Sequence, residues 1–211
     1  MNDIKILELL ASKICHDLIS PVGAISNGIE ILEEMGPDAG DEVTALIASS
    51  TTQANAKLKT LRMVYGLGGA DDSIRISDIH ALFGEFIESE KRLSHDWNPH
   101  DDFGITPKAG FAKMLLAALI LVSETLPRGG IISVEAGEEN TILVTGKGEN
   151  ANFQENFLHA LEHKTRAEDL SPKHVHAYVT GLLAQNYGFE ITPDNTDGDF
   201  ICLRLKSSTV F

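Results

Sequence analysis

The stretch CHDLISPVG places a histidine, an aspartate and a proline inside a segment whose apolar spacing predicts one long helix. In its neutral form near pH 7, the imidazole of His16 is a nucleophile, and the carboxylate of Asp17 beside it could orient or polarise the ring. Pro21 lacks a backbone donor and is costly inside a helix. Packing alone requires none of these residues, and their pattern is uncommon in a chain of this length, so it favours a functional role for His16.

Two predicted helices position this histidine. Apolar or small residues recur at steps of three and four through the first helix, which is a heptad seam, at Ile4, Leu7, Ala11, Ile14, Leu18, Pro21, Ile25, Gly28 and Leu32. Gly36, Pro37 and Gly40 predict its end, and a second helix is expected from about Glu42 to Tyr65. Two helices cannot bury such wide apolar stripes alone, so we expect two copies of the chain to form a four-helix bundle. Packing of the hairpin on the rest of its own chain stays open as the alternative.

The heptad position of His16 predicts that its ring faces solvent. With Ile4 at position a, His16 falls at position f, opposite the seam. The same face carries the small or polar residues Ser12, Ser20 and Gly23, with one apolar side chain, Ile19. This composition favours a docking surface for a partner protein, although an isolated surface histidine by itself needs no functional explanation.

Composition excludes several classes of function. The 211 residues are 43% hydrophobic and 23% charged, which is typical of a folded globular protein. A formal net charge of −14 disfavours nucleic-acid binding, which requires clustered Lys and Arg. The N-terminal residues lack a signal-peptide pattern, and no run is long and apolar enough to span a membrane. Cys15 and Cys202 indicate neither a disulfide framework nor a metal site, so we expect a protein of the reduced cytoplasm with no membrane partner.

The rest of the chain predicts an α/β sandwich after the hairpin, and an α+β fold for the whole. An amphipathic helix is expected in IRISDIHALFGEFIESEKRL and a buried helix in AGFAKMLLAALILVSETL. GIISVEAG and NTILVTGKG read as two strands joined by a turn, PKHVHAYVTGLLAQNYGFEITPDN as a helix followed by a strand, and DFICLRLK as a final strand. We therefore divide the chain into residues 1–70, the helical hairpin, and residues 71–211, the sandwich.

The motif HDLISP resembles the phosphoacceptor box of histidine kinases, and the order of elements after residue 71 resembles their ATP-binding domain, with LPRGGIISVEA as the matching stretch. The nucleotide-binding residues of that family are missing. The helix segment ALIL from Ala118 offers no asparagine for Mg²⁺, and Val144 stands where an aspartate reads the adenine. His174 and His176 stand where glycines cradle phosphates. We expect the protein to bind neither ATP nor a metal ion.

A phosphoacceptor hairpin joined to a degenerate ATP-binding domain resembles the ChpT-type histidine phosphotransferases of alphaproteobacteria. The resemblance covers essentially the whole chain, and CHDLISPVGAISNGIEIL is its most specific part. It implies a homodimer that relays a phosphoryl group on His16 between the receiver domain of a hybrid histidine kinase and response regulators, with Mg²⁺ only in the receiver. By the same resemblance Asp17 is the acidic neighbour of the phosphoacceptor, and the receiver docks on Ser12, Ile19, Ser20 and Gly23. Lys147 is a further candidate contact.

Two other functions stay open at this stage. The protein could be a noncatalytic dimeric adaptor that docks receiver domains, or, against the missing nucleotide residues, an active ATP-dependent histidine kinase. The direction of phosphoryl flow is also open, as is the role of Asp17, which could instead contact a partner because adjacent helix residues diverge. His95 and His100 in LSHDWNPHDD have the residue types of a metal site, but their surroundings favour a solvated loop.

Overall fold

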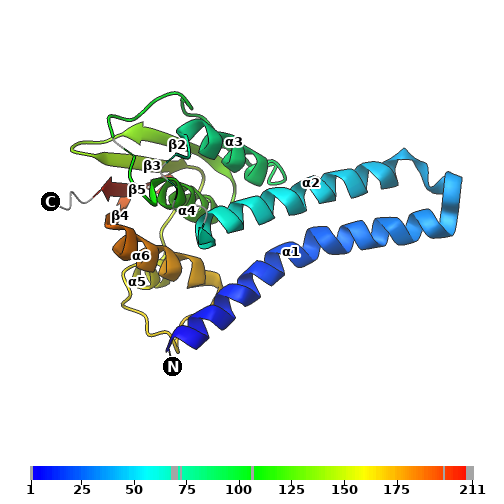
Figure 1. Ribbon diagram of the computed structural model, residues 1–211, viewed down its shortest axis with the longest axis horizontal. Coiled ribbons are helices and arrows are strands. Elements are labelled where there is room, and N and C mark those ends of the chain that lie inside the picture. The colour runs from blue at the N-terminus through cyan, green and yellow to red at the C-terminus, as the bar shows by residue number, and fades with distance from the viewer. Residues whose placement is uncertain (1, 68–70, 72, 106, 197, 208–211) are drawn as a thin grey trace.

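The computed structural model describes residues 2–67, 71, 73–105, 107–196 and 198–207, and it has two parts (Figure 1). A long helical hairpin extends away from a sandwich of a five-stranded sheet and helices. The predicted α+β class is confirmed, and the predicted helices and strands occur in the expected order, with an additional strand at Leu93–His95 and an additional helix at Glu155–Leu161. The predicted division between residues 70 and 71 falls at a stretch where 68–70 and 72 lie outside the described residues, and it stays a prediction.

The hairpin consists of α1 (Asn2–Met35) and α2 (Gly40–Tyr65), joined by the short 3-10 helix η1 (Gly36–Ala39). Gly36 and Gly40 have positive φ angles of 55° and 74°, which allow the chain to reverse there. The two helices approach closely at Gly28, where an added Cβ would lie 2.6 Å from Cγ1 of Ile47. The heptad seam therefore faces α2 from about Ile14 to Leu32, whereas its first residues, Ile4, Leu7 and Ala11, are exposed. Helix α1 continues through Pro21 without a break.

A second row of apolar side chains on the hairpin remains exposed in the single chain. Val22 and Ile29 share one side of α1 with Ile4, the exposed first residue of the seam, and the exposed fractions of Ile4, Val22 and Ile29 are 62%, 54% and 45%. Leu46 and Leu58 on α2 are also exposed. The predicted four-helix bundle requires exposed apolar side chains of this kind on the hairpin, and the bundle itself stays a prediction.

The sheet has the order β1-β2-β3-β5-β4, with β1 parallel to β2 and every other pair antiparallel. Its strands are β1 (Leu93–His95), β2 (Gly130–Ala136), β3 (Thr141–Lys147), β4 (Phe189–Thr196) and β5 (Phe200–Ser207). The helices of the sandwich are α3 (Ile76–Ile87), α4 (Phe111–Glu124), α5 (Glu155–Leu161) and α6 (Val175–Tyr187), with the 3-10 helix η3 (Pro172–His174) before α6. No helix in the described ranges is long and apolar enough to cross a membrane.

Helix α4 is the centre of the molecule, between the sheet and the end of α2 (Figure 1). Its side chains from Phe111 to Ser123 are all buried, and they pack on the inward side chains of β3 and β5, such as Val144 and Leu203. Lys113 of α4, only 2% exposed, donates to the backbone carbonyls of Val64 and Gly66 at 2.7 and 2.6 Å. These bonds satisfy carbonyls at the end of α2 and join the hairpin to the sandwich.

The expectation of a solvated loop at LSHDWNPHDD is wrong for its first half. Residues 93–95 form the edge strand β1, and Trp97 is 7% exposed. The ring of His95 lies 4.5 Å from that of His80 and 5.6 Å from that of Phe83, centroid to centroid. A three-residue strand carries no periodicity of its own, so only its pairing with β2 reveals it.

Candidate functional site

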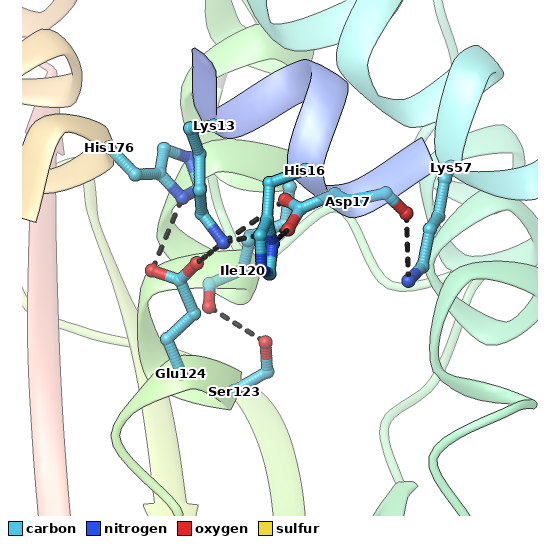
Figure 2. Close-up of polar contacts among 8 residues, drawn as sticks. All are labelled: Lys13, His16, Asp17, Lys57, Ile120, Ser123, Glu124 and His176. Atoms are coloured by element: carbon cyan, nitrogen blue, oxygen red, sulfur yellow. Dashed lines mark hydrogen bonds and ion pairs between the residues drawn. The ribbon is translucent and has the colours of Figure 1, made fainter. Parts of the chain in front are cut away.

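His16 projects from α1 into solvent, as its heptad position predicts. Its side chain is 86% exposed, and its Nδ1 lies 3.3 Å from Oδ1 of Asp17 (Figure 2). A carboxylate only accepts hydrogen bonds, so a hydrogen bond at this contact requires the ring proton to be on Nδ1. The other nitrogen, Nε2, then keeps its lone pair, which makes it the nucleophilic atom of the ring.

Asp17 is the next residue in the chain, yet its side chain is only 25% exposed. Lys13, one helical turn earlier, donates to Oδ1 at 3.1 Å and lies 3.0 Å from Oδ2. Lys57 of α2 donates to the backbone carbonyl of Asp17 at 3.4 Å. The carboxylate is therefore held at both oxygens, against the ring rather than away from it.

The sandwich contributes two further side chains to this cluster. Glu124, the last residue of α4, lies 3.4 Å from the ammonium of Lys13 through Oε1 and 3.4 Å from Nδ1 of His176 through Oε2 (Figure 2). His176, on the first turn of α6, is buried with 4% of its side chain exposed, and its ring meets that of Tyr65 edge-on at 5.7 Å. A continuous polar chain thus runs from α6 through α4 to the face of α1 that carries His16.

The charges in this chain stabilise one another. Burial alone would lower the pKa of Lys13, but the carboxylates of Glu124 and Asp17 raise it overall. Burial alone would raise the pKa of Glu124, but His176 and Lys13 lower it overall. Burial, with Glu124 and Asp17 nearby, raises the pKa of the Tyr65 phenol well above its usual range. Lys13 and Glu124 are therefore both charged at neutral pH, as an ion pair.

Two cavities open on either side of the Lys13–Glu124 pair. The first, of about 790 Å³, is lined by Ser12 and His16 of the hairpin and faces polar groups of the sandwich, among them Asn152 and Lys173. The second, of about 560 Å³, lies between the hairpin and the segment around α3 and β1, and Asp17 and Lys57 line it. Both Lys13 and Glu124 line both cavities, so the pair bridges the gap between the two parts of the molecule.

The predicted docking residues are on the same side of α1 as His16. Ile19 is 68% exposed, Ser12 and Ser20 are exposed, and an added Cβ at Gly23 would meet nothing within 4 Å. Lys147 is at the end of β3, exposed, and outside the residues that line the cavity beside His16. The structure therefore groups the α1 residues with His16 but does not bring Lys147 into that group.

The positions that the sequence analysis matched to the nucleotide-binding residues of kinases differ in their surroundings, and His174 lines the cavity beside His16. Residues 117–121 of α4 are at most 4% exposed, and Val144 is fully buried. Nδ1 of His174 lies 3.1 Å from Oγ of Ser171, and His176 is in the cluster with Glu124. Among the described residues there is no group of His, Cys, Asp and Glu arranged to hold a metal ion.

The sequence analysis missed three members of the polar chain. Lys13 had a local signal, because Lys and Asp four residues apart on a helix form an ion pair. Glu124 and His176 had none, since their contacts join segments far apart in the sequence. His176 was noted only as a departure from a glycine, with no partner.

Comparisons with known proteins give a consistent result. A family model described as the histidine phosphotransferase C-terminal domain matches residues 76–199. The protein phosphotransferase ChpT of Brucella abortus (strain 2308) is 34% identical over 197 residues, which span 92% of this chain and 91% of that protein. A solved structure described as a bacterial phosphotransferase is 29% identical, with a TM-score of 0.74 and a coverage of 96% of both chains.

Proposed function

Because the chain belongs to the histidine phosphotransferase family, we propose that His16 is the residue that carries its phosphoryl group. The protein is a histidine phosphotransferase of a phosphorelay. The observation that carries the assignment to His16 is its geometry: an 86% exposed ring with Nδ1 against a carboxylate and Nε2 open to a partner.

The transfer is a nucleophilic displacement at phosphorus. The Nε2 lone pair of neutral His16 attacks the phosphorus of an aspartyl phosphate on a receiver domain. The new N–P bond forms as the P–O bond to the receiver aspartate breaks, and the electron pair leaves with that carboxylate. The ring becomes a phosphoimidazolium that keeps its proton on Nδ1, where the Asp17 carboxylate stabilises the positive charge. The reverse sequence passes the group to the next aspartate.

The partner surface that we propose is the face of α1 around His16. The receiver must bring its aspartate in line with Nε2, which requires small neighbours such as Ser12, Ser20 and Gly23. Ile19 offers an exposed apolar side chain for the partner to cover. Mg²⁺ would arrive in the acidic pocket of the receiver, and Lys147 would contact the receiver only at the periphery.

The exposed apolar row on the hairpin supports a homodimer as the working form. Ile4, Val22 and Ile29 face away from α2, and a second hairpin would bury them in a four-helix bundle. His16 is on a different side of α1 from this row, so dimerisation would leave its ring accessible.

We also propose that the phosphoryl group on His16 comes from a donor other than ATP. Residues 117–121 carry no side-chain oxygen for Mg²⁺, and Val144 cannot accept a hydrogen bond from adenine. We therefore expect that ATP neither labels the protein nor changes its melting temperature.

The test is transfer of labelled phosphate from a phosphorylated receiver domain to the purified protein. We expect acid-labile label on the wild type and none on His16→Ala, with no label from ATP alone. Label retained on His16→Ala would refute the assignment of His16. Failure of the wild type to take label from receivers that it binds would instead favour the noncatalytic adaptor.

A further inference from the structure

The polar chain described above connects the sandwich to the group that orients the phosphoacceptor. His176 contacts Glu124, Glu124 contacts Lys13, and Lys13 binds both oxygens of Asp17. Asp17 in turn contacts Nδ1 of His16, as Figure 2 shows. Four of these five side chains are at most 31% exposed, and only His16 projects into solvent.

The polar chain from His176 to Asp17 differs from an ordinary ion pair on the protein surface. Exposed pairs contribute little, but Lys13 and Glu124 are partly buried, and each has a second partner that fixes its position. Cavities lie on both sides of the pair, so if Glu124 were lost Lys13 would keep its pair with Asp17 on its own helix but would lose this contact with the sandwich. The placement of Asp17 thus depends on a residue of the sandwich.

We propose that Glu124, supported by His176, is a positioning residue for phosphotransfer: it holds Lys13 so that the Asp17 carboxylate keeps the proton of His16 on Nδ1 and leaves Nε2 as the attacking atom. This inference rests on the proposed role of His16. By this inference the sandwich, which we expect to bind no nucleotide, contributes a residue that helps to orient the phosphoacceptor.

The proposal accounts for the protons at each stage. Before transfer, the neutral ring carries one proton, on Nδ1, directed at Asp17. During transfer that proton stays on Nδ1 while Nε2 gains phosphorus, and the ring becomes positive beside the carboxylate. Without the charge of Glu124, Lys13 keeps its pair with Asp17 on the same helix but loses its anchor on the sandwich, so the carboxylate is held less firmly against the ring. A larger share of the protein would then carry the ring proton on Nε2, where it blocks attack.

Nuclear magnetic resonance of the side-chain nitrogens of His16 tests the first half of this inference without any partner. We expect the wild type, labelled with ¹⁵N-histidine, to show the Nδ1–H tautomer of His16 as the main form. In Glu124→Gln the Nδ1–H share should fall. The matched control is Glu85→Gln, which removes an exposed ion pair of the same kind between hairpin and sandwich, Lys59–Glu85 at 2.9 Å, and should leave the tautomer unchanged.

Transfer kinetics from a phosphorylated receiver test the second half. In Glu124→Gln the maximal transfer rate should fall roughly tenfold, because a misdirected nucleophile loses its alignment, while the receiver concentration at half-maximal rate changes less than about twofold. Lys13→Met should behave likewise. Lys13→Arg, which keeps the charge and the donors, should retain most of the rate.

The outcomes separate the inference from the proposed function. If the wild type transfers phosphate and Glu124→Gln matches Glu85→Gln in both tautomer and rate, Glu124 has no positioning role. If the wild type takes no phosphate, the proposed function fails, and the tautomer measurement still decides whether Glu124 acts on His16. Unchanged melting temperatures for Glu124→Gln and Glu85→Gln would show that neither effect is a consequence of unfolding.

Discussion

His16 and Asp17 are adjacent in the chain and 3.3 Å apart at Nδ1 and Oδ1, yet 86% of one side chain is exposed and only 25% of the other. The two requirements of a phosphoacceptor site, an accessible ring and a fixed group that orients it, are therefore met by two different residues. The ring reaches a partner, while the carboxylate stays in a partly buried cluster where its position is fixed by Lys13. If the Asp17 carboxylate were fully solvated, water would compete with the His16 ring for its oxygens, and the carboxylate would orient the ring less well.

His16→Ala should leave the fold intact. The imidazole packs on little besides Asp17, so we expect its removal to change the free energy of unfolding by less than about 0.5 kcal/mol. Urea denaturation followed by circular dichroism measures this change. Phe83→Ala, at a fully buried position, should cost about 3–5 kcal/mol in the same assay. A large loss for His16→Ala would mean that its phenotype in transfer assays reflects folding.

Lys113→Met should loosen the junction between hairpin and sandwich. The substitution keeps the length of the side chain but leaves the carbonyls of Val64 and Gly66 without their donor. We expect a loss of about 2 kcal/mol in the free energy of unfolding, from buried acceptors left unpaired. Lys5→Met, at an exposed position of α1, is the control and should change stability little. Equal effects of the two variants would refute the structural role of Lys113.

Charge on the exposed apolar row should break the proposed dimer. Val22→Glu and Ile29→Glu each place a carboxylate where the bundle would be dry, so we expect either variant to be a monomer at micromolar concentration. Light scattering coupled to gel filtration measures the mass. Ile131→Glu introduces the same charge on an exposed position of β2 and should leave the dimer unchanged. A monomeric wild type would contradict the bundle itself.

Local patterns in the sequence predict most of the elements, because each pattern has the period of the structure it forms. The heptad seam predicts α1 and the outward direction of His16, and the alternation of Ile201, Leu203 and Leu205 predicts the inward face of β5. Strand β1 is too short to carry a period. No local pattern distinguishes Glu124 from other polar residues at helix ends, since its contacts are with Lys13 of α1 and His176 of α6. Contacts between distant segments leave no local pattern.

Stability should fall as the pH drops below neutral because of two histidines packed beside Trp97. Burial lowers the pKa of His80, a hydrogen bond with the backbone of Trp97 opposes this effect, and the nearby His100 adds to it. Burial lowers the pKa of His95 as well, with His80 adding to it and Asp96 opposing it. The unfolded chain therefore takes up protons at a higher pH than the folded chain does. Stability is fully present above the ordinary histidine pKa of about 6.5 and is lost as the pH falls toward the lower folded values.

The double variant His80→Gln, His95→Gln measures this contribution. Its free energy of unfolding, from urea denaturation at a series of pH values between about 5.5 and 7.5, should depend less on pH than that of the wild type. The comparison uses the slope of the free energy of unfolding against pH, so a loss of stability that is the same at every pH does not affect it. Glu124 does not interfere in this range, because its lowered pKa confines its own loss of stability to lower pH. An unchanged slope in the double variant would show that the His80–His95 pair does not cause the acid sensitivity.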